Sequence, residues 1–192
     1  MKEQSNEQQP YYKMGVIHGR FQILHNDHLR YLLAGKALCE HLVVGITNPD
    51  PSLTRNDPAD PNRSTREANP LSYFERCTLI KETLLAAGID CRHFTIVPFP
   101  INLPELYFHY VPREAIFFVS IYDDWGRKKR DIFESLGLKT HVLWEVTLEE
   151  KGISGSDIRT AMIMNQPWEH LVPPTAAALI KAWEIPLRLK ST

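Results

Sequence analysis

The stretch that decides the fold of this chain reads Met14-Gly15-Val16-Ile17-His18-Gly19-Arg20-Phe21-Gln22-Ile23-Leu24-His25-Asn26-Asp27-His28. Its first residues, Met14 to Ile17, form a short apolar run typical of a buried strand, and Gly19 then breaks that run. Leucines follow at helical spacing, at Leu29, Leu32, Leu33 and Leu38. The stretch therefore predicts a strand that turns through glycine into an amphipathic helix.

A strand that turns in this way leaves backbone N–H groups at the helix start without partners, and the helix dipole adds partial positive charge there. Such a helix start is suited to binding phosphate. Arg20, His25 and His28 add cationic or hydrogen-bond-donating side chains at the same place, and the two histidines can share one face of the first turn. We therefore predict a phosphate-binding site at this helix start.

The length of 192 residues fits one domain, and 43% hydrophobic with 23% charged residues is typical of a globular protein. A formal net charge of -1 argues against a general binder of nucleic acid or anionic membranes, and no apolar run has the length of a membrane span. The 3 cysteines lack paired metal spacing, which fits a reducing cytoplasm as the expected location. No histidine has metal-ligand spacing with them, so no protein metal site is expected.

The order of patterns along the chain predicts its organisation. Residues 1–12 are polar, which predicts a disordered lead-in to a single domain at 13–192. Apolar runs predict five strands, at 14–17, 42–47, 94–99, 115–121 and 141–146. Further helices are expected from Pro70 to about Gly88 and at 123–136, 154–164 and 174–183, with a long polar loop at 48–69. This alternation predicts a Rossmann-like, doubly wound α/β domain with a parallel sheet, C-terminal helices, and ligands beyond the carboxyl ends of the strands.

A second informative segment is Gly152-Ile153-Ser154-Gly155-Ser156-Asp157-Ile158-Arg159. Ser154 and Asp157 have the spacing of a capping box, which predicts a helix start. That pattern alone is also typical of any well-capped helix. Whether this segment is functional therefore depends on its occurrence together with the motif at residues 19–28.

Three other segments contain polar residues that can stabilise a helix start or contact a ligand. Asn69 and Pro70 predict a helix start, with Asn69 as the cap and Pro70 in the first position. Asp123 and Asp124 follow the fourth predicted strand, where they can contact a ligand or cap the next helix. Arginines of the long loop suit a phosphate-carrying acceptor, namely Arg55, Arg63 and Arg66.

Gly19-Arg20-Phe21-Gln22, with His25 and His28, resembles the signature of the nucleotidylyltransferase superfamily of the H-x-G-H type. The likeness is closest to nicotinamide-mononucleotide adenylyltransferases of archaeal and bacterial type. Residues 153–159 resemble the family's second signature, I-S-G-S-x-I-R, and residues 69–76 resemble its N-P-x-[ST]-x-x-E-R helix start. The chain departs from the family by having Asp27 in place of a glycine and Ile23 in place of a proline. The resemblance covers most of residues 13–165.

The resemblance implies transfer of a nucleotidyl group from ATP to a phosphomonoester, nicotinamide mononucleotide, giving NAD and pyrophosphate, with Mg²⁺ bound through the triphosphate. It implies catalytic roles for four residues: His25, His28, Arg20 and Arg159. The nucleotide-binding residues would be Gly19, Phe21, Gln22, Asp123, Asp124, Trp125, Ile153, Ser154, Gly155 and Ser156. The acceptor-binding residues would be Asn69, Arg76, Tyr107, Arg55 and Arg66. Tyr107 takes the position where a family tryptophan stacks on the nicotinamide ring.

Two other functions stay open from the sequence. One is a cytidylyltransferase acting on another phosphate or phosphonate, for which Asp27 and the long polar loop leave room. The other is a nucleotide-sensing domain without turnover, which a negative charge beside a polyphosphate would favour. The expected partners are a nucleoside triphosphate and a small phosphorylated acceptor, without nucleic acid or membrane, and a homo-oligomer stays open.

Overall fold

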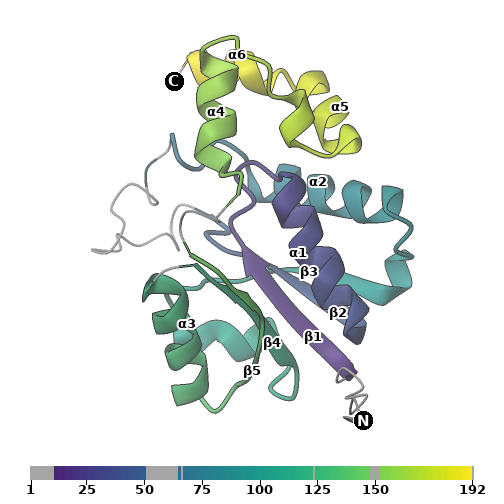
Figure 1. Ribbon diagram of the computed structural model, residues 1–192, viewed down its shortest axis with the longest axis vertical. Helices are drawn as coiled ribbons and strands as arrows, with labels where there is room; N and C mark the ends of the chain where they lie inside the picture. The colour runs from purple at the N-terminus through teal and green to yellow at the C-terminus, as the bar shows by residue number, and fades with distance from the viewer. Residues whose placement is uncertain (1–10, 51–64, 66, 123, 148–151, 192) are drawn as a thin grey trace, which may run out of the picture.

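The computed structural model describes residues 11–50, 65, 67–122, 124–147 and 152–191, with the side chain of Trp125 left out. One 5-stranded sheet organises these residues, in the order β3-β2-β1-β4-β5, and all its pairings are parallel (Figure 1). The strands are β1 (Tyr12–Gly19), β2 (Cys39–Ile46), β3 (Phe94–Pro98), β4 (Ile116–Ile121) and β5 (Lys139–Glu145). The predicted doubly wound parallel sheet is therefore confirmed.

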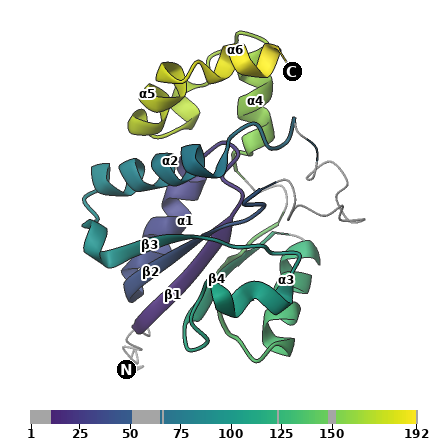
Figure 2. The same cartoon turned by 180° about the vertical axis from the view of Figure 1, so that it is seen from behind.

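Helices cover both faces of the sheet and its carboxyl edge. The α-helices are α1 (Asn26–Ala37), α2 (Tyr73–Ala86), α3 (Asp124–Ser135), α4 (Gly155–Ile163), α5 (Pro174–Ala182) and α6 (Ile185–Lys190). Short 3₁₀ helices are η3 (Cys91–His93), η4 (Pro104–His109) and η5 (Glu169–Leu171). The C-terminal helices α4, α5 and α6 stack together beyond the carboxyl end of β1 (Figures 1 and 2).

Alternation along β1 explains the two layers of core. Ile17 packs into one buried cluster with Leu32 of α1 and with apolar residues of α2. Its neighbour Val16 packs into a second cluster with Phe133 of α3 and Tyr107 of η4. Because successive side chains of a strand point to opposite faces, a strand covered on both sides must be apolar at every position. This is the physical reason for the continuous apolar runs in the sequence.

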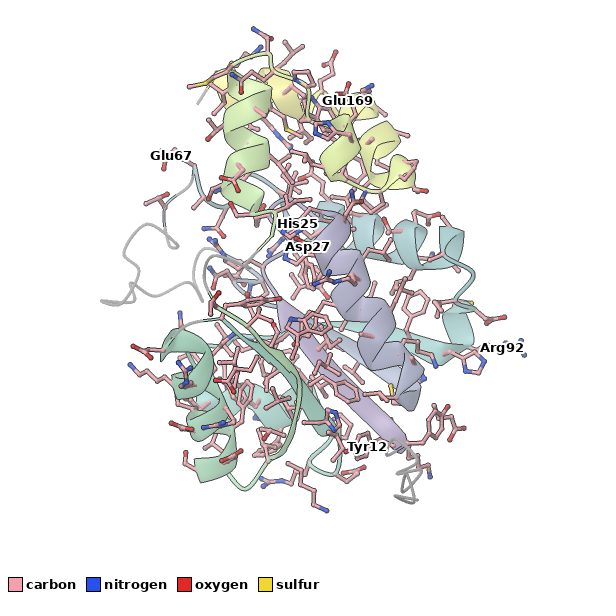
Figure 3. All side chains as sticks on the ribbon, in the orientation of Figure 1. Tyr12, His25, Asp27, Glu67, Arg92 and Glu169 are labelled. Atoms are coloured by element: carbon pink, nitrogen blue, oxygen red, sulfur yellow. The ribbon has the colours of Figure 1, made fainter. Side chains whose placement is uncertain are left out.

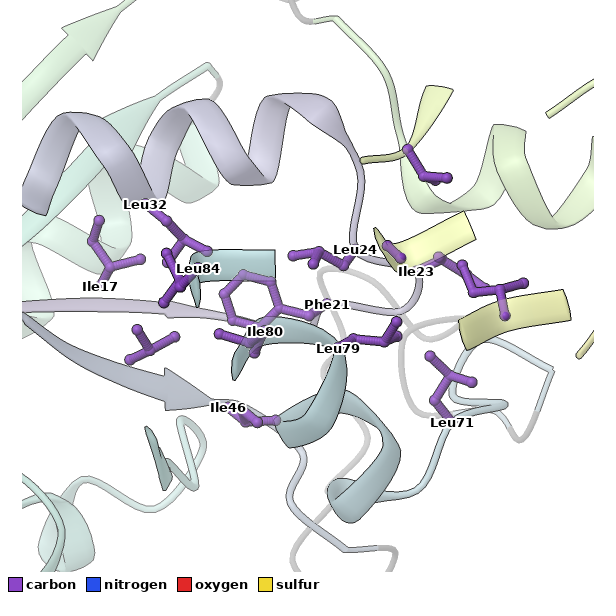
Figure 4. Close-up of a cluster of buried hydrophobic side chains, with 14 of the residues drawn as sticks. Ile17, Phe21, Ile23, Leu24, Leu32, Ile46, Leu71, Leu79, Ile80 and Leu84 are labelled. Carbon is purple, nitrogen blue, oxygen red and sulfur yellow. The ribbon is translucent and has the colours of Figure 1, made fainter. Parts of the chain in front are cut away.

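The connection between β1 and α1 is held in the core by its own side chains. Phe21, Ile23 and Leu24 are all almost completely buried, and they join the cluster that contains Ile17 and Leu32 (Figure 4). Burying a large apolar side chain contributes about 1.5–3 kcal/mol, so this connection is firmly anchored. The backbone that precedes α1 is therefore fixed by packing.

Two predicted boundaries differ from the observed ones. β1 begins at Tyr12, inside the predicted lead-in, and the Tyr12 hydroxyl makes a 2.9 Å hydrogen bond with His141 Nδ1. α2 begins at Tyr73 with Ser72 as its N-cap, so the expectation of Asn69 as cap and Pro70 in the first turn is wrong. The physical reason is that the backbone N–H and C=O of Leu71 are both bound by the side chain of Gln22, at 2.9 Å each, which keeps Leu71 outside the helix.

The described part of the chain contains no helix that is both long and apolar enough to cross a membrane. The lead-in residues 1–10 lie outside the described residues.

Candidate active site

The first half of the site is the start of α1, where two histidines form an interlocked pair. His25 is the N-cap, and its Nδ1 accepts a hydrogen bond from the His28 amide at 3.4 Å. His28 Nδ1 accepts from the His25 amide at the same distance, and the two rings stack with centroids 3.6 Å apart. The sequence spacing predicted a shared face. The structure adds a capping box made of two imidazoles.

This pairing favours one tautomer in both rings, and burial keeps both rings neutral. An imidazole nitrogen that accepts a hydrogen bond carries no proton, so the proton of each neutral ring lies on Nε2. Burial lowers the pKa of His25 to about 4. Burial lowers the pKa of His28 well below its ordinary value; His25 and Arg20 act in the same direction, and a hydrogen bond to the Ile23 backbone acts against them. At neutral pH both side chains are therefore uncharged donors. Of the two alternatives drawn from the sequence, cation or donor, the structure supports the donor.

The second half of the site is the start of α4. Ser154 is the N-cap, and its hydroxyl accepts from the Asp157 amide at 3.2 Å while the Asp157 carboxylate accepts from the Ser154 amide at 3.1 Å. The predicted capping box is confirmed. A helix start whose first amides are ordered in this way is suited to an anion.

The two halves meet although they come from opposite ends of the domain. The Arg159 guanidinium donates from Nη1 to the Gln22 carbonyl and from Nη2 to the Ser156 hydroxyl, the latter at 3.1 Å. A Cβ on Gly155 would lie 2.4 Å from the Gln22 carbonyl oxygen and 2.8 Å from the Ile23 nitrogen. Backbone therefore packs directly on backbone here, and only a glycine fits.

Asp27 adds a further link between the two helix starts. Its Oδ2 accepts a hydrogen bond from the Ile153 amide at 2.7 Å. Figure 3 shows His25 and Asp27 together where the start of α1 faces the start of α4. The carboxylate of Asp27 also acts to raise the pKa of His25, against the larger effect of burial.

Arg76 braces the backbone beneath the site. Its side chain is only 2% exposed and donates to four backbone carbonyls. Those of Arg20, Thr47 and Asn48 lie just beyond the ends of β1 and β2, at 2.7–3.1 Å, and that of Ser72 precedes α2, at 3.3 Å. Burial lowers the pKa of Arg76 to about 10, so it stays cationic at neutral pH. The resemblance implies a contact between Arg76 and the acceptor, whereas in the structure the Arg76 guanidinium donates to backbone carbonyls and braces them.

Three predicted ligand-binding side chains are directed into the interior. Phe21 belongs to the core and is 1% exposed, with its ring 5.0 Å from that of His28. The side-chain amide of Gln22 donates to the Leu71 carbonyl and accepts from the Leu71 N–H. Tyr107 is 1% exposed, stacks on Phe99 with centroids 4.5 Å apart, and donates its hydroxyl to the Ile101 carbonyl at 2.5 Å. These side chains are therefore part of the interior packing, and contact of Tyr107 with an acceptor stays a prediction.

Other predicted residues contact groups outside the histidine pair or lie outside the described part. Asn69 donates to the Thr65 carbonyl at 2.9 Å. Asp124 is exposed and forms an ion pair with Arg127 at 3.2 Å. Arg55, Arg66 and Asp123 lie outside the described residues, as does the side chain of Trp125.

One polar residue of the carboxyl edge is not among the predicted site residues. His18 is buried against Phe99 and Phe133, and neither ring nitrogen has a hydrogen-bond partner within the described residues. Burial lowers its pKa well below the ordinary value, and Lys129 acts in the same direction. The apolar run that precedes Gly19 was the available signal, because a histidine within such a run must be buried.

A protein-family model described as Cytidylyltransferase-like matches residues 16–161 of this chain. A phosphonoformate cytidylyltransferase from Streptomyces viridochromogenes is 48% identical over 177 residues, which are 92% of this chain and 95% of the relative. A nicotinamide-nucleotide adenylyltransferase from Thermococcus onnurineus is 27% identical over 174 residues, 88% of this chain and 82% of the relative. These sequence relatives share nucleotidyl transfer and differ in the nucleotide and the acceptor that their names give.

A solved structure supports the same fold. The bifunctional NMN adenylyltransferase/ADP ribose pyrophosphatase from Francisella tularensis superposes with a TM-score of 0.65 at 16% identity, over 94% of this chain and 53% of that one. Together with the match of the family model over most of the domain, the comparisons confirm the superfamily suggested by the two signatures. The chain belongs to the cytidylyltransferase-like family of nucleotidyltransferases.

Proposed function

We propose that this protein transfers a cytidylyl group from CTP to a small phosphonate or phosphate acceptor and releases pyrophosphate. The observation that carries the transfer reaction is the meeting of the two helix starts: Arg159 and Gly155 of α4 lie against the backbone that leads into the histidine pair of α1. Two helix N-termini and two uncharged imidazole donors thus face one region, which suits a polyphosphate.

The reaction needs no protein nucleophile. A phosphonate or phosphate oxygen of the acceptor attacks the α-phosphorus of the triphosphate and forms a new P–O bond. The bond between the α-phosphorus and the bridging oxygen to the β-phosphorus breaks, and pyrophosphate leaves with that oxygen and its electron pair. The protein therefore acts by positioning and by stabilising charge that develops in the transition state.

Each residue of the site has a role consistent with its geometry. The ring N–H groups of His25 and His28 are proposed to donate to phosphate oxygens as neutral donors, with His28 exchanging its hydrogen bond to the Ile23 backbone for one to phosphate. The guanidinium of Arg20 and the α4 start, held in place by Arg159, neutralise the leaving pyrophosphate. Arg76 keeps the ends of β1 and β2 in fixed relation, so that these donors stay aligned.

Mg²⁺ is proposed to arrive with the triphosphate. Its preferred ligands are phosphate oxygens, water and one or two carboxylates. The carboxylates at the two helix starts already hold backbone amides, Asp27 that of Ile153 and Asp157 that of Ser154, which fits an ion carried mainly by the nucleotide. When bound, Mg²⁺ supplies neutralisation of phosphate charge.

CTP and a phosphonate are favoured over ATP and nicotinamide mononucleotide by two observations. Identity to the cytidylyltransferase relative is 48%, against 27% to the adenylyltransferase from Thermococcus onnurineus. In addition, Tyr107 replaces the family tryptophan and is packed on Phe99, so in this structure its ring offers no free face to a nicotinamide. The adenylyltransferase reaction, which gives NAD, is the second candidate, supported by the Thermococcus relative.

A pyrophosphate-release assay separates these functions. CTP and ATP are each tested with phosphonoformate, a simple phosphomonoester and nicotinamide mononucleotide, and ³¹P NMR identifies the product. Turnover with CTP and a phosphonate supports the proposal, whereas turnover confined to ATP and nicotinamide mononucleotide replaces it with the second candidate. Tight binding of a triphosphate without turnover in any combination indicates a sensing domain. Absence of triphosphate binding would overturn all three functions.

A further inference from the structure

We propose that Asp27 is a positioning residue that fastens the segment 152–156 to the first turn of α1 and so holds the second phosphate-binding element in place before nucleotide arrives. This rests on the proposed nucleotidyl transfer, because the segment is inferred to bind the triphosphate. The residue stands where the family resemblance places a glycine. A negative charge at this point would otherwise only oppose a polyphosphate.

The contact itself is well formed. The Asp27 carboxylate accepts the Ile153 amide at 2.7 Å, which is a short, charge-assisted hydrogen bond across 126 positions of sequence. Ile153 immediately precedes the N-cap Ser154, so its amide lies outside the hydrogen bonding of α4. The Ile153 side chain packs against the core cluster. Asp27 therefore fixes the backbone one residue before the proposed phosphate-binding turn begins.

The absence of a side chain at Gly152 leaves the space that the Asp27 carboxylate occupies. A Cβ at Gly152 would lie 2.2 Å from Asp27 Oδ2 and 3.1 Å from its carboxyl carbon. The carboxylate could move aside, but its position is set by the Ile153 amide, so making room for a side chain would mean giving up that hydrogen bond. The structure thus requires a residue without a side chain at 152 as long as Asp27 makes this contact.

Three contacts from different residues hold the same segment against the α1 connection. Asp27 binds the Ile153 amide, Gly155 lies on the Gln22–Ile23 backbone, and Arg159 donates to the Gln22 carbonyl. Fixing a loop in its binding geometry lowers the entropy lost on binding. We therefore expect Asp27 to act mainly on the affinity for the triphosphate, through KM, and less on kcat.

Asp27→Gly, Asp27→Ala and Asp27→Asn separate positioning from charge. Gly and Ala remove the hydrogen bond and the charge together, whereas Asn keeps an acceptor oxygen for the Ile153 amide and removes the charge. Positioning predicts that KM for CTP rises about tenfold in the Gly and Ala variants, since a hydrogen bond to a charged group is lost, and that Asn restores most of the affinity. If all three variants bind CTP more tightly than the wild type, Asp27 acts by repulsion and the proposal is overturned.

A double-mutant cycle tests the match with Gly152. Gly152→Ala is expected to raise KM about tenfold in the wild type and to have little effect in the Asp27→Gly background, because the clashing carboxylate is then gone. Additive effects of the two substitutions would contradict the proposed contact. Gly88→Ala serves as a control for an added methyl outside the site: a Cβ there meets nothing within 4 Å, and although its φ of +83° costs stability, KM should not change.

Amide hydrogen exchange on the nucleotide-free protein gives a readout that does not depend on activity. Asp27→Gly is expected to speed exchange of the Ile153 and Ser154 amides at least tenfold while those of β1 keep their protection. Unchanged exchange at these two amides would overturn the positioning role even if the enzyme proves active. Faster exchange in a protein that transfers no nucleotide to any acceptor would support the role and instead refute the proposed function.

Discussion

The guanidinium of Arg159 donates a hydrogen bond to the carbonyl of Gln22, which lies 137 residues earlier in the chain. The same side chain binds the Ser156 hydroxyl at 3.1 Å, so it holds the first turn of α4 and the approach to α1 at once. It is 9% exposed. This side chain is therefore one of the three contacts, with those of Asp27 and Gly155, that hold the two proposed phosphate-binding elements together.

Arg159→Lys is expected to lower kcat/KM roughly a hundredfold in the pyrophosphate-release assay. A lysine ammonium keeps the charge but cannot serve two acceptors with the geometry of a planar guanidinium. Circular dichroism and thermal unfolding check that the fold is kept. Arg92→Lys is the control, because Arg92 is exposed and pairs only locally with Asp90. Equal rates in the wild type and Arg159→Lys would show that the bidentate contact is dispensable.

Gly155→Ala is expected to weaken binding of CTP by at least about tenfold. The added methyl meets the backbone of Gln22 and Ile23, which cannot rotate away, so α4 has to shift from the α1 connection. Isothermal titration calorimetry measures the affinity. Gly88→Ala introduces the same methyl at a backbone φ of +83°, where it costs stability but should leave affinity unchanged. Affinity that survives in Gly155→Ala would mean that the close approach is not needed.

His28→Ala is expected to reduce turnover by about two to three orders of magnitude, since one donor to the transition state is lost. His25 loses its stacking partner in this variant, so unfolding by urea is measured alongside to confirm a folded protein. His109→Ala is the matched control, because His109 is exposed on η4. Unchanged pyrophosphate release in a folded His28→Ala protein would remove His28 from the proposed machinery.

Stability is expected to fall as the solution is acidified below about pH 6.5. Burial lowers the pKa of His18, His25 and His28, for His25 to about 4, whereas the unfolded chain titrates near 6.5. Below that pH the unfolded chain takes up protons that the native protein does not. The stabilising contribution is thus complete above 6.5 and, for His25, is lost between 6.5 and about 4, at up to about 1.4 kcal/mol per pH unit per histidine.

Urea unfolding at pH values from 7.5 to 4.5 measures this dependence. His18→Leu should show a shallower slope than the wild type, because one buried, unprotonated imidazole is gone while the carboxyl groups are unchanged. Identical slopes for the two proteins would mean that His18 is accessible to protons in the folded state.

Arg76→Met is expected to lower the free energy of unfolding by about 3 kcal/mol or more. Four backbone carbonyls lose their donor, and those of Arg20 and Thr47 lie at the ends of the central strands. Urea unfolding measures the loss, with the exposed Arg92→Met as a control that should change little. A small loss in Arg76→Met would show that water or neighbouring groups take over the carbonyls.

Much of the fold follows from local sequence. The apolar runs around Ile17, Val44 and Phe118 locate three of the strands, because a strand covered on both faces needs apolar side chains throughout. The capping box of Ser154 and Asp157 locates the start of α4 within one residue. These predictions succeed because strand alternation and helix capping involve residues close together in the chain.

Local sequence patterns could not predict whether the side chains of the site residues point toward a ligand or into the core. Phe21 and Tyr107 match ligand-contacting positions of the family, yet the structure places both in the core. Asn69 precedes a proline and resembles a helix cap, yet Ser72 takes that role because Gln22 holds Leu71 outside the helix. A side chain at an element's end can face solvent, ligand or another segment, and its immediate neighbours do not decide between them.

The sequence by itself determined the parallel α/β sheet, the order of strand and helix around Gly19 and the residue types of the phosphate-binding motifs, since these follow from the pattern within each element and from the order of the elements along the chain. Only the tertiary structure decided that Arg159 reaches Gln22, that Asp27 binds the Ile153 amide and that both histidines are uncharged. The physical reason is that these properties arise from contacts across more than a hundred residues and from burial, which exist only once the C-terminal helices have packed over the carboxyl edge of the sheet.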